Sequence, residues 1–184
     1  MDLHTFSIVA RDPATGDLGI AVATARPNVG SLVPWASRRG AIATQARVNT
    51  ELGRQGLALL DAGVRLDAAL GALLEADEDR ARRQVHAIDA AGRTFAHTGS
   101  ECVAWCGHER GTDFSVAGNM LAGPQVIAET AAAYQSNAAL PFAERLMAAL
   151  AAGEAAGGDK RGKQGAALLI NTTEAYAALD IRVD

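Results

Sequence analysis

The 184-residue chain is short of several features that mark specialised classes of protein. Aromatic residues make up only 4% of the sequence, and its two small basic clusters, at 80–83 and 160–163, lack the interleaved aromatic residues on which nucleic acids stack. The apolar runs fall well below the roughly 20 residues that cross a bilayer. With a net charge of only −4, the sequence argues against a nucleic-acid partner and against membrane insertion.

The first ten residues lack the basic start and long apolar run of a secretory signal, so we expect a cytoplasmic protein. Apolar residues make up 49% of the chain, which lies within the globular range. No internal repeat or low-complexity linker divides the sequence. Its length therefore predicts a single domain over residues 1–184 with a sizeable core.

Two cysteines are too few for a disulfide framework. Cys102 and Cys106 lie in a segment that reads as extended chain, which separates them by roughly 13 Å, farther than the roughly 7 Å between Cα atoms that a disulfide allows. We expect ordinary buried thiols at both positions.

No metal or nucleotide cofactor is expected. The four histidines, which are His4, His86, His97 and His108, lack metal-ligand spacing. Residues 157–164 approach a phosphate-binding loop, but Gln164 stands where that loop needs a hydroxyl for magnesium, and the loop runs from a predicted helix into a predicted strand.

The clearest periodicity in the sequence begins at residue 5. Thr5, Ser7 and Val9 share one face of an extended segment, and Phe6, Ile8 and Ala10 share the other. Turn residues at 12–17 and a second apolar run at 18–24 complete a hairpin. A threonine near a chain end is a weak nucleophile that a free α-amine on the same residue can activate. The alternative is that these hydroxyls are ordinary strand residues.

The remaining pattern alternates strands with pairs of helices. Further strands are predicted at 41–46, 84–89, 93–99, 102–107, 114–120, 166–171 and 176–183. Helices are predicted from an N-cap at Thr50 to Gly63, over 66–74, from Pro124 through Tyr134, and from Pro141 to Gly153, with Met147 on the core face of the last. Residues 77–83 are interpreted as a charged, solvated connector.

Strands joined by tight turns pair antiparallel, and two helix pairs can each cover one sheet. The sequence therefore predicts an α+β fold, a four-layer α/β/β/α sandwich of two stacked antiparallel sheets.

Two amide side chains stand out at the ends of predicted strands. Asn119, next to Gly118, is placed to donate a hydrogen to a developing oxyanion, and so is Gln45 at the end of the 41–46 strand. The alternative for Asn119 is an ordinary turn residue, and the same alternative stays open for Gln45.

Several segments together resemble a bacterial family known as domain of unknown function 1028. They are Thr5–Asp12, Ala43–Ala46, His97–Gly99, Trp105–His108, Gly118–Pro124 and Gly157–Gln164, in the order expected and over nearly the whole chain. The resemblance implies the fold of N-terminal-nucleophile (Ntn) hydrolases, which is also a four-layer sandwich. It further implies cleavage of amide bonds by a nucleophile at the amino end of the first strand.

Carried onto this sequence, the resemblance implies Thr5 as the nucleophile, with Gln45 and Asn119 orienting the substrate or holding the oxyanion. His97, Gly118 and Ser7 are the expected substrate-binding residues, and we expect Thr5 to face a cleft lined by Gln45, His97 and Asn119. The implied partner is a small-molecule amide or peptide.

The four residues before Thr5 leave a second interpretation open. In the family the matching threonine usually follows the initiator methionine directly, whereas here residues 1–4 block its amine. A non-catalytic ligand-binding or assembly module on the same fold is therefore the alternative, and the sequence leaves a homo-oligomer open.

Overall fold

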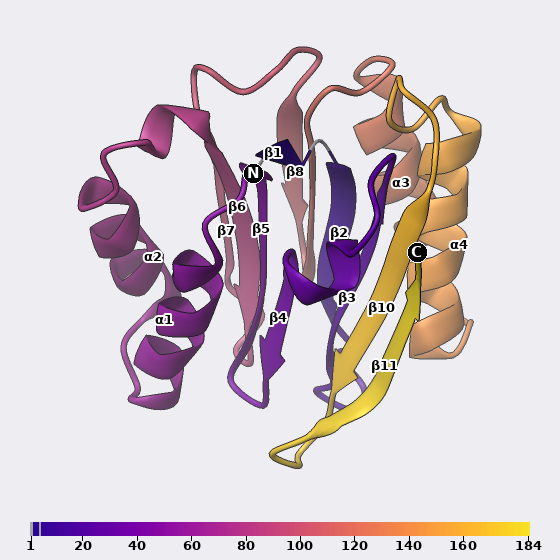
Figure 1. Ribbon diagram of the computed structural model, residues 1–184. Helices are drawn as coiled ribbons and strands as arrows, with labels where there is room; N and C mark the ends of the chain where they lie inside the picture. Colours follow the sequence, from indigo (N-terminus) through magenta and orange to yellow (C-terminus); the bar gives the residue numbers. More distant parts are fainter. Residues whose placement is uncertain (1, 4) are drawn as a thin grey trace.

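A computed structural model describes residues 2, 3 and 5–184, with side chains for 5–184. Two antiparallel sheets are stacked face to face, and a pair of helices covers the outer face of each sheet (Figure 1). This arrangement confirms the predicted four-layer α/β/β/α sandwich. No helix in the described part of the chain is long and apolar enough to cross a membrane.

The first sheet, sheet A, is built around β5 (Gly40–Arg47). One side of β5 pairs with β1 (Asp2–Leu3) near its end and with β4 (Pro34–Ser37) near its start. The other side pairs with β6 (Arg83–Asp89), which pairs in turn with β7 (Thr94–Thr98).

The second sheet, sheet B, has its amino-terminal hairpin near the centre. That hairpin consists of β2 (Thr5–Arg11) and β3 (Leu18–Thr24). The strand order across the sheet is β11-β10-β3-β2-β9-β8. The other bounds are β8 (Gly107–Gly111), β9 (Phe114–Gly118), β10 (Gly165–Asn171) and β11 (Ala177–Val183).

Two helices, α1 (Thr50–Asp61) and α2 (Leu66–Glu75), cover sheet A. The side chain of Asn49 accepts a hydrogen bond from the Glu51 N–H, so the N-cap is Asn49 rather than the expected Thr50. A Cβ atom at Gly56 would lie 2.7 Å from Ile42 Cδ1, so close packing accounts for that glycine.

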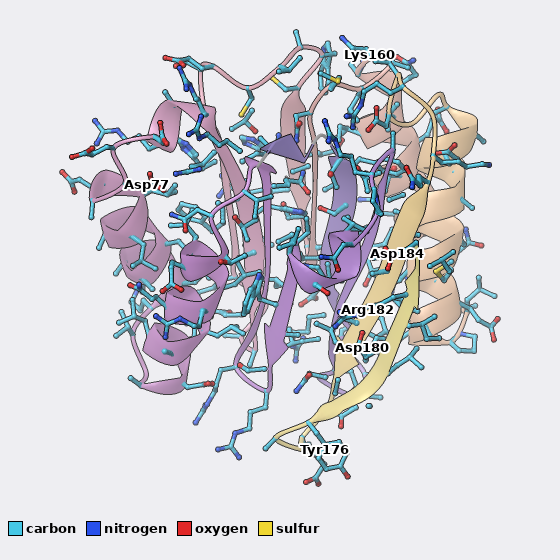
Figure 2. All side chains as sticks on the ribbon, viewed as in Figure 1. Asp77, Lys160, Tyr176, Asp180, Arg182 and Asp184 are labelled. Atoms are coloured by element: carbon cyan, nitrogen blue, oxygen red, sulfur yellow. The ribbon has the colours of Figure 1, made fainter. Side chains whose placement is uncertain are left out.

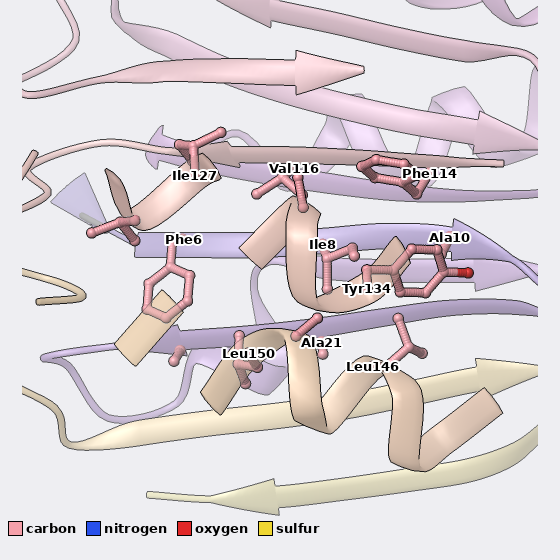
Figure 3. Packing of buried hydrophobic residues seen from close by; sticks show 14 of the residues in the cluster. Phe6, Ile8, Ala10, Ala21, Phe114, Val116, Ile127, Tyr134, Leu146 and Leu150 are labelled. Atoms are coloured by element: carbon pink, nitrogen blue, oxygen red, sulfur yellow. The ribbon is translucent and has the colours of Figure 1, made fainter. Parts of the chain in front are cut away.

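The other pair, α3 (Gln125–Ser136) and α4 (Phe142–Ala155), covers sheet B. Figure 3 shows Phe6, Ile8 and Ala10 of β2 pointing at these helices, where they meet Tyr134 and Leu146. Two short 3-10 helices, η1 (Val29–Ser31) and η2 (Arg80–Arg82), lie on connections between elements.

Four details of the sequence prediction for these elements are wrong. β4 and most of β8 were not predicted, because short edge strands carry little periodicity. Met147, which was expected on the core face of α4, is 45% exposed, and Ala149 is buried there instead. Gly153 lies inside α4, where Thr130 and Phe6 leave no room for a Cβ atom.

The segment around the cysteines is also not the extended strand that the sequence predicted. It turns between Gly99 and Gly107, so that Cys106 Sγ lies 3.5 Å from the carbonyl oxygen of Cys102. Both thiols are free and partly buried, and burial raises the pKa of Cys102 to about 11. The thiols are therefore protonated near neutral pH.

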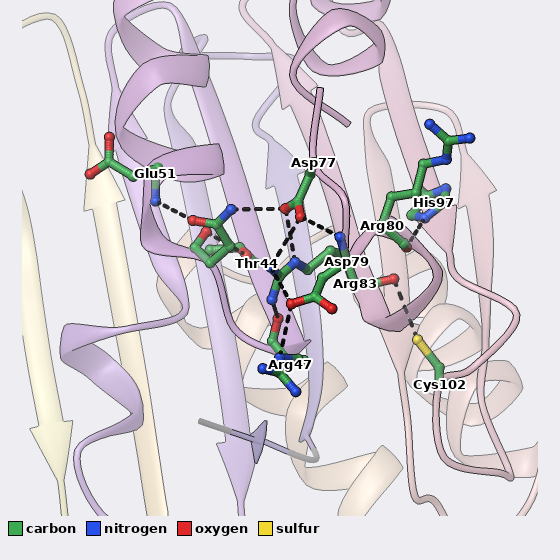
Figure 4. Close-up of polar contacts among 10 residues, drawn as sticks. Thr44, Arg47, Glu51, Asp77, Asp79, Arg80, Arg83, His97 and Cys102 are labelled. Carbon is green, nitrogen blue, oxygen red and sulfur yellow. Dashed lines mark hydrogen bonds and ion pairs between the residues drawn. The ribbon is translucent and has the colours of Figure 1, made fainter. Parts of the chain in front are cut away.

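The sequence predicted a solvated connector at 77–83, but this segment is partly buried. The side chains of Asp77 and Arg83 are each only 9% exposed and form a close ion pair (Figure 4). Asn49 donates to the same carboxylate, and Arg83 donates to the carbonyl oxygen of Arg47. These contacts tie the start of β6 to the connection between β5 and α1.

Candidate functional site

The layer between the two sheets is polar at one end. The period of two places alternate residues of each strand in this layer, and at this end those residues carry hydroxyl, amide or imidazole groups. None of their side chains is exposed: Thr5, Ser7, Gln45, Gln84, His86, Ser115 and Asn119 all have 0% relative exposure. Such groups are stable without water only when they satisfy one another's hydrogen bonds.

Gln84 on β6 lies at the centre of this cluster. Its Nε2 donates to the carbonyl oxygen of Gly118 at 2.8 Å, and it also contacts the Thr98 hydroxyl and the Gly107 carbonyl. Its Oε1 accepts from Gln45 Nε2 at 2.8 Å and from Asn119 Nδ2 at 2.9 Å. One side chain therefore holds both candidate oxyanion donors in place.

The fixed orientation of Gln84 sets the direction of the hydrogen bonds beyond it. Because Gln45 turns its Nε2 to Gln84, its Oε1 faces Ser7 and accepts the serine hydroxyl hydrogen at 2.7 Å. His86 Nε2 lies 2.7 Å from the same Ser7 oxygen, so it carries a hydrogen and donates. His86 Nδ1 lies 3.2 Å from the Ser115 hydroxyl oxygen.

This order of donors decides what Ser7 and His86 can do. A histidine that acts as a base toward serine must accept the serine proton, whereas here the imidazole donates to the serine oxygen. Burial, with a smaller contribution from the charge of His108, lowers the pKa of His86 to about 3, so the ring is neutral. Ser7 and His86 are therefore structural members of the cluster in this arrangement.

Thr5 is the exception within the cluster. Its Oγ1 is one of two buried side-chain nitrogen or oxygen atoms in the described part of the chain without a hydrogen-bond partner. Its carbonyl oxygen accepts from the Asn119 N–H at 3.0 Å, and Thr24 lies opposite it on β3. An unpaired buried hydroxyl costs about 1–3 kcal/mol, so this atom needs an explanation other than stability.

The backbone next to Gln45 and Asn119 is unusual as well. Ala46 and Met120, the residues that directly follow them, have φ angles of 66° and 55°. A residue with a Cβ atom rarely adopts this left-handed backbone conformation, which costs about 1–2 kcal/mol. Local strain of this kind clusters at functional sites, and here it turns the chain immediately after both candidate oxyanion donors.

Residues 2 and 3, which form β1, belong to the opposite sheet. β1 pairs with the end of β5, with Leu3 opposite Ala46, whereas Thr5 begins β2 in sheet B. Residues 2 and 3 thus lie beside the polar end of the layer.

Comparison with known proteins identifies the relatives of this arrangement. A model of the "Family of unknown function (DUF1028)" matches residues 5–184. The chain belongs to this family. The DUF1028 protein SPO2555 from Silicibacter pomeroyi has a crystal structure that is 34% identical in sequence, with a TM-score of 0.91 over 98% of this chain and 78% of that one. No curated protein matches the chain.

The structure of this DUF1028 protein brings together most of the predicted site residues. Gln45 and Asn119 meet through Gln84, Ser7 bonds to Gln45, and Gly118 contributes its carbonyl oxygen to Gln84. Thr5 lies at the same end through its main-chain bond with Asn119.

His97 is not part of this group. It pairs with Val85 on β6, and residues opposite each other in a sheet share a face, so His97 lies on the helix-covered side of sheet A. Its Nε2 contacts the Arg80 carbonyl oxygen at 2.9 Å (Figure 4). The expectation that His97 lines a cleft with Thr5 does not agree with this placement.

Sequence reasoning missed three members of the cluster: Gln84, His86 and Ser115. The signal was present for β6, since Gln84 and His86 alternate with apolar Val85 and Ala87 and therefore share one face. Ser115 gave no such signal, because it lies in an otherwise apolar strand. Among the described residues, no group of three or more histidine, cysteine or acidic side chains is placed to hold a metal ion.

Proposed function

We propose that this protein is an amidohydrolase of the Ntn type, which acts on a small amide or peptide with Thr5 as its nucleophile. The observation that carries the proposal is the Thr5 hydroxyl, which is fully buried and has no hydrogen-bond partner within a cluster whose other members are bonded to one another. Its position as the first residue of β2 and the four-layer sandwich support the same class.

The reaction requires a free amine on Thr5, which is released when residues 1–4 are removed. The amine, whose reference pKa is about 7.7–8.0, takes the hydroxyl proton while Oγ1 attacks the amide carbon. The amine then passes this proton to the leaving nitrogen, the C–N bond breaks, and an ester on Thr5 remains. Water hydrolyses that ester and restores the hydroxyl.

The oxyanion of the tetrahedral intermediate is the charge that the surrounding amides would stabilise. Gln45 Nε2 and Asn119 Nδ2 each donate to Gln84 Oε1 in this structure, which fixes the position of both amide groups. Donors that are fixed before the reaction stabilise the developing charge without reorganising, and many acyl-transfer enzymes owe most of their rate enhancement to such donors. Gln84 would act as the positioning residue for both amides.

A second function is favoured by a separate observation. Residues 2 and 3 form β1, which pairs with β5 and so has a structural role in sheet A. If residues 1–4 stay attached, the protein is a non-catalytic ligand-binding or assembly module on the same fold.

Four proteins separate these functions: the full chain, a chain that begins at Thr5, and the shorter chain with either Thr5→Ala or Thr173→Ala. Thr173 is an exposed residue in the turn between β10 and β11, so its variant serves as the matched control. Each protein is screened against amides and dipeptides and then treated with a β-lactone, which acylates an activated threonine. Ring opening expels no leaving group, so the adduct carries the whole mass of the lactone.

The proposal expects activity and a Thr5 adduct only in the shorter chain and its Thr173→Ala control. Loss of the nucleophile should lower the rate by several orders of magnitude. An adduct on Ser7, or equal activity in all four proteins, would remove Thr5 from this role. No adduct in any protein, with folding verified by circular dichroism, would support the binding module.

A further inference from the structure

β11 is an outer strand of sheet B. Among the described residues, one of its two edges pairs with no other strand. It pairs with β10 along its length, and it stands at the end of the strand order. Three of the seven exposed large apolar side chains among residues 5–184 lie on it or next to it: Tyr176, Ile181 and Val183. Long edge strands with exposed apolar side chains are the templates on which further strands pair.

The two faces of β11 differ in chemistry. Ile181 lies opposite Leu168, which belongs to the core under α3 and α4, and Val183 shares this face and is 61% exposed. Asp180 and Arg182 alternate with them on the other face (Figure 2). These two form an ion pair at 3.0 Å, and each remains more than 40% exposed.

The order of these residues makes the strand complementary to itself. If two copies pair antiparallel with Ile181 opposite Ile181, Asp180 of each copy lies opposite Arg182 of the other, and Leu179 lies opposite Val183. Both charged pairs are attractive, and both apolar pairs lie on one face, so one register satisfies the two faces together.

Two neighbouring registers also place the apolar face of one strand beside the apolar face of the other and the charged face beside the charged face, but both bring like charges together. A register centred on residue 180 sets Asp180 against its own copy. A register centred on residue 182 sets Arg182 against itself and Asp180 against Asp184. Like charges directly opposite each other are destabilising, so the charges select the register centred on Ile181.

We propose that β11 binds β11 of a second copy of this chain, which joins two B sheets into one continuous sheet across a two-fold axis. The occupant is identified by the alternation of one acidic and one basic residue about a central isoleucine, which suits the same strand reversed. β8, the other outer strand of sheet B, offers no comparable surface, since it reads Gly-His-Glu-Arg-Gly and carries no aliphatic side chain.

The test is a charge exchange measured by sedimentation equilibrium over a range of protein concentrations. Asp180→Arg gives a strand with two arginines, and Arg182→Asp gives a strand with two aspartates. Each variant alone turns both attractive pairs into repulsive ones, so the dissociation constant of its dimer should be about 10- to 30-fold higher than that of the wild-type dimer.

Mixing the two variants should restore the affinity, because each arginine then faces an aspartate, and the double variant D180R/R182D should dimerise by itself. Thermal melts confirm that each variant is folded, and Ile181→Lys tests the apolar face independently. A wild-type chain that stays monomeric up to millimolar concentration would overturn the proposal. So would a dimer that is unaffected by the single charge changes or is not restored by the mixture.

Discussion

β2 contributes Thr5 and Ser7 to one end of the layer between the sheets and Val9 to the other. Around Val9 the layer is closed by aliphatic side chains, among them Leu18, Ile20 and Ile88, which need only volume to pack well. Around Ser7 it is closed by Gln45 and His86, whose contacts depend on which atom donates.

The comparison shows how one pair of sheets divides two tasks. Apolar contacts have no direction, so the end around Val9 supplies stability that tolerates small shifts. Buried hydrogen bonds add little net stability but cost much when one partner is lost, so the polar end fixes atoms in place. The Thr5 hydroxyl is the group that this fixed arrangement leaves without a partner.

The largest expected effect comes from removing the centre of the polar end. Gln84→Leu should lower the free energy of unfolding by about 3–5 kcal/mol, because Gln45 Nε2, Asn119 Nδ2 and the Gly118 carbonyl would each lose a buried hydrogen bond at once. Ile20→Val, at the apolar end, removes one methyl group and should cost only about 1 kcal/mol. Urea unfolding of both variants measures the contrast, and equal losses would show that the two ends do not differ.

A smaller effect is expected from pH. The pKa of His86 is lowered to about 3 in the fold and returns to about 6.5 on unfolding, so the unfolded chain takes up a proton first as the pH falls. The contribution of neutral His86 to the free energy of unfolding is therefore complete above pH 6.5. Below pH 6.5 it declines by at most about 1.4 kcal/mol per pH unit.

Between pH 7 and pH 4, the free energy of unfolding should therefore fall more steeply with decreasing pH in the wild type than in His86→Gln. His108, whose pKa burial also lowers, contributes to both proteins and cancels in the comparison. Identical slopes would mean that His86 is not neutral in the fold.

The smallest expected effect is the change in stability when a single hydroxyl is removed, and its sign should differ between Thr5 and Ser7. Thr5→Val should stabilise the full chain by about 1 kcal/mol, because it removes an unpaired buried hydroxyl while keeping the side-chain shape. Ser7→Ala should destabilise it by about 1–3 kcal/mol, because Gln45 and His86 each lose a partner. Calorimetric melts decide the signs, and a destabilising Thr5→Val would show that the hydroxyl is bonded after all.

Much of the fold was predictable from short stretches of sequence. The alternation at residues 5–10 predicted the two faces of β2, and the helical spacing of Leu66, Leu70 and Leu74 predicted the buried face of α2. Both patterns are local, since the periods of strands and helices are set by backbone geometry within one element. The four layers followed from the order of those elements.

The candidate site was only partly predictable, as the two histidines make clear. His86 and His97 both lie in strands, yet only His86 faces the layer between the sheets, because the register of β7 on β6 sets His97 opposite Val85. A shift of one residue in that register would exchange the faces, and nothing near His97 in the sequence specifies it.

The sequence by itself determined which residues form strands and helices and which sides of them are apolar. Only the tertiary structure decided that Ser7 meets Gln45 and His86, residues 38 and 79 positions away, and that Thr5 Oγ1 meets no partner. The physical reason is that hydrophobic burial is nondirectional and can be inferred from pattern alone. A buried hydrogen bond between side chains exists only when two specific atoms from distant parts of the chain arrive within about 3 Å of each other.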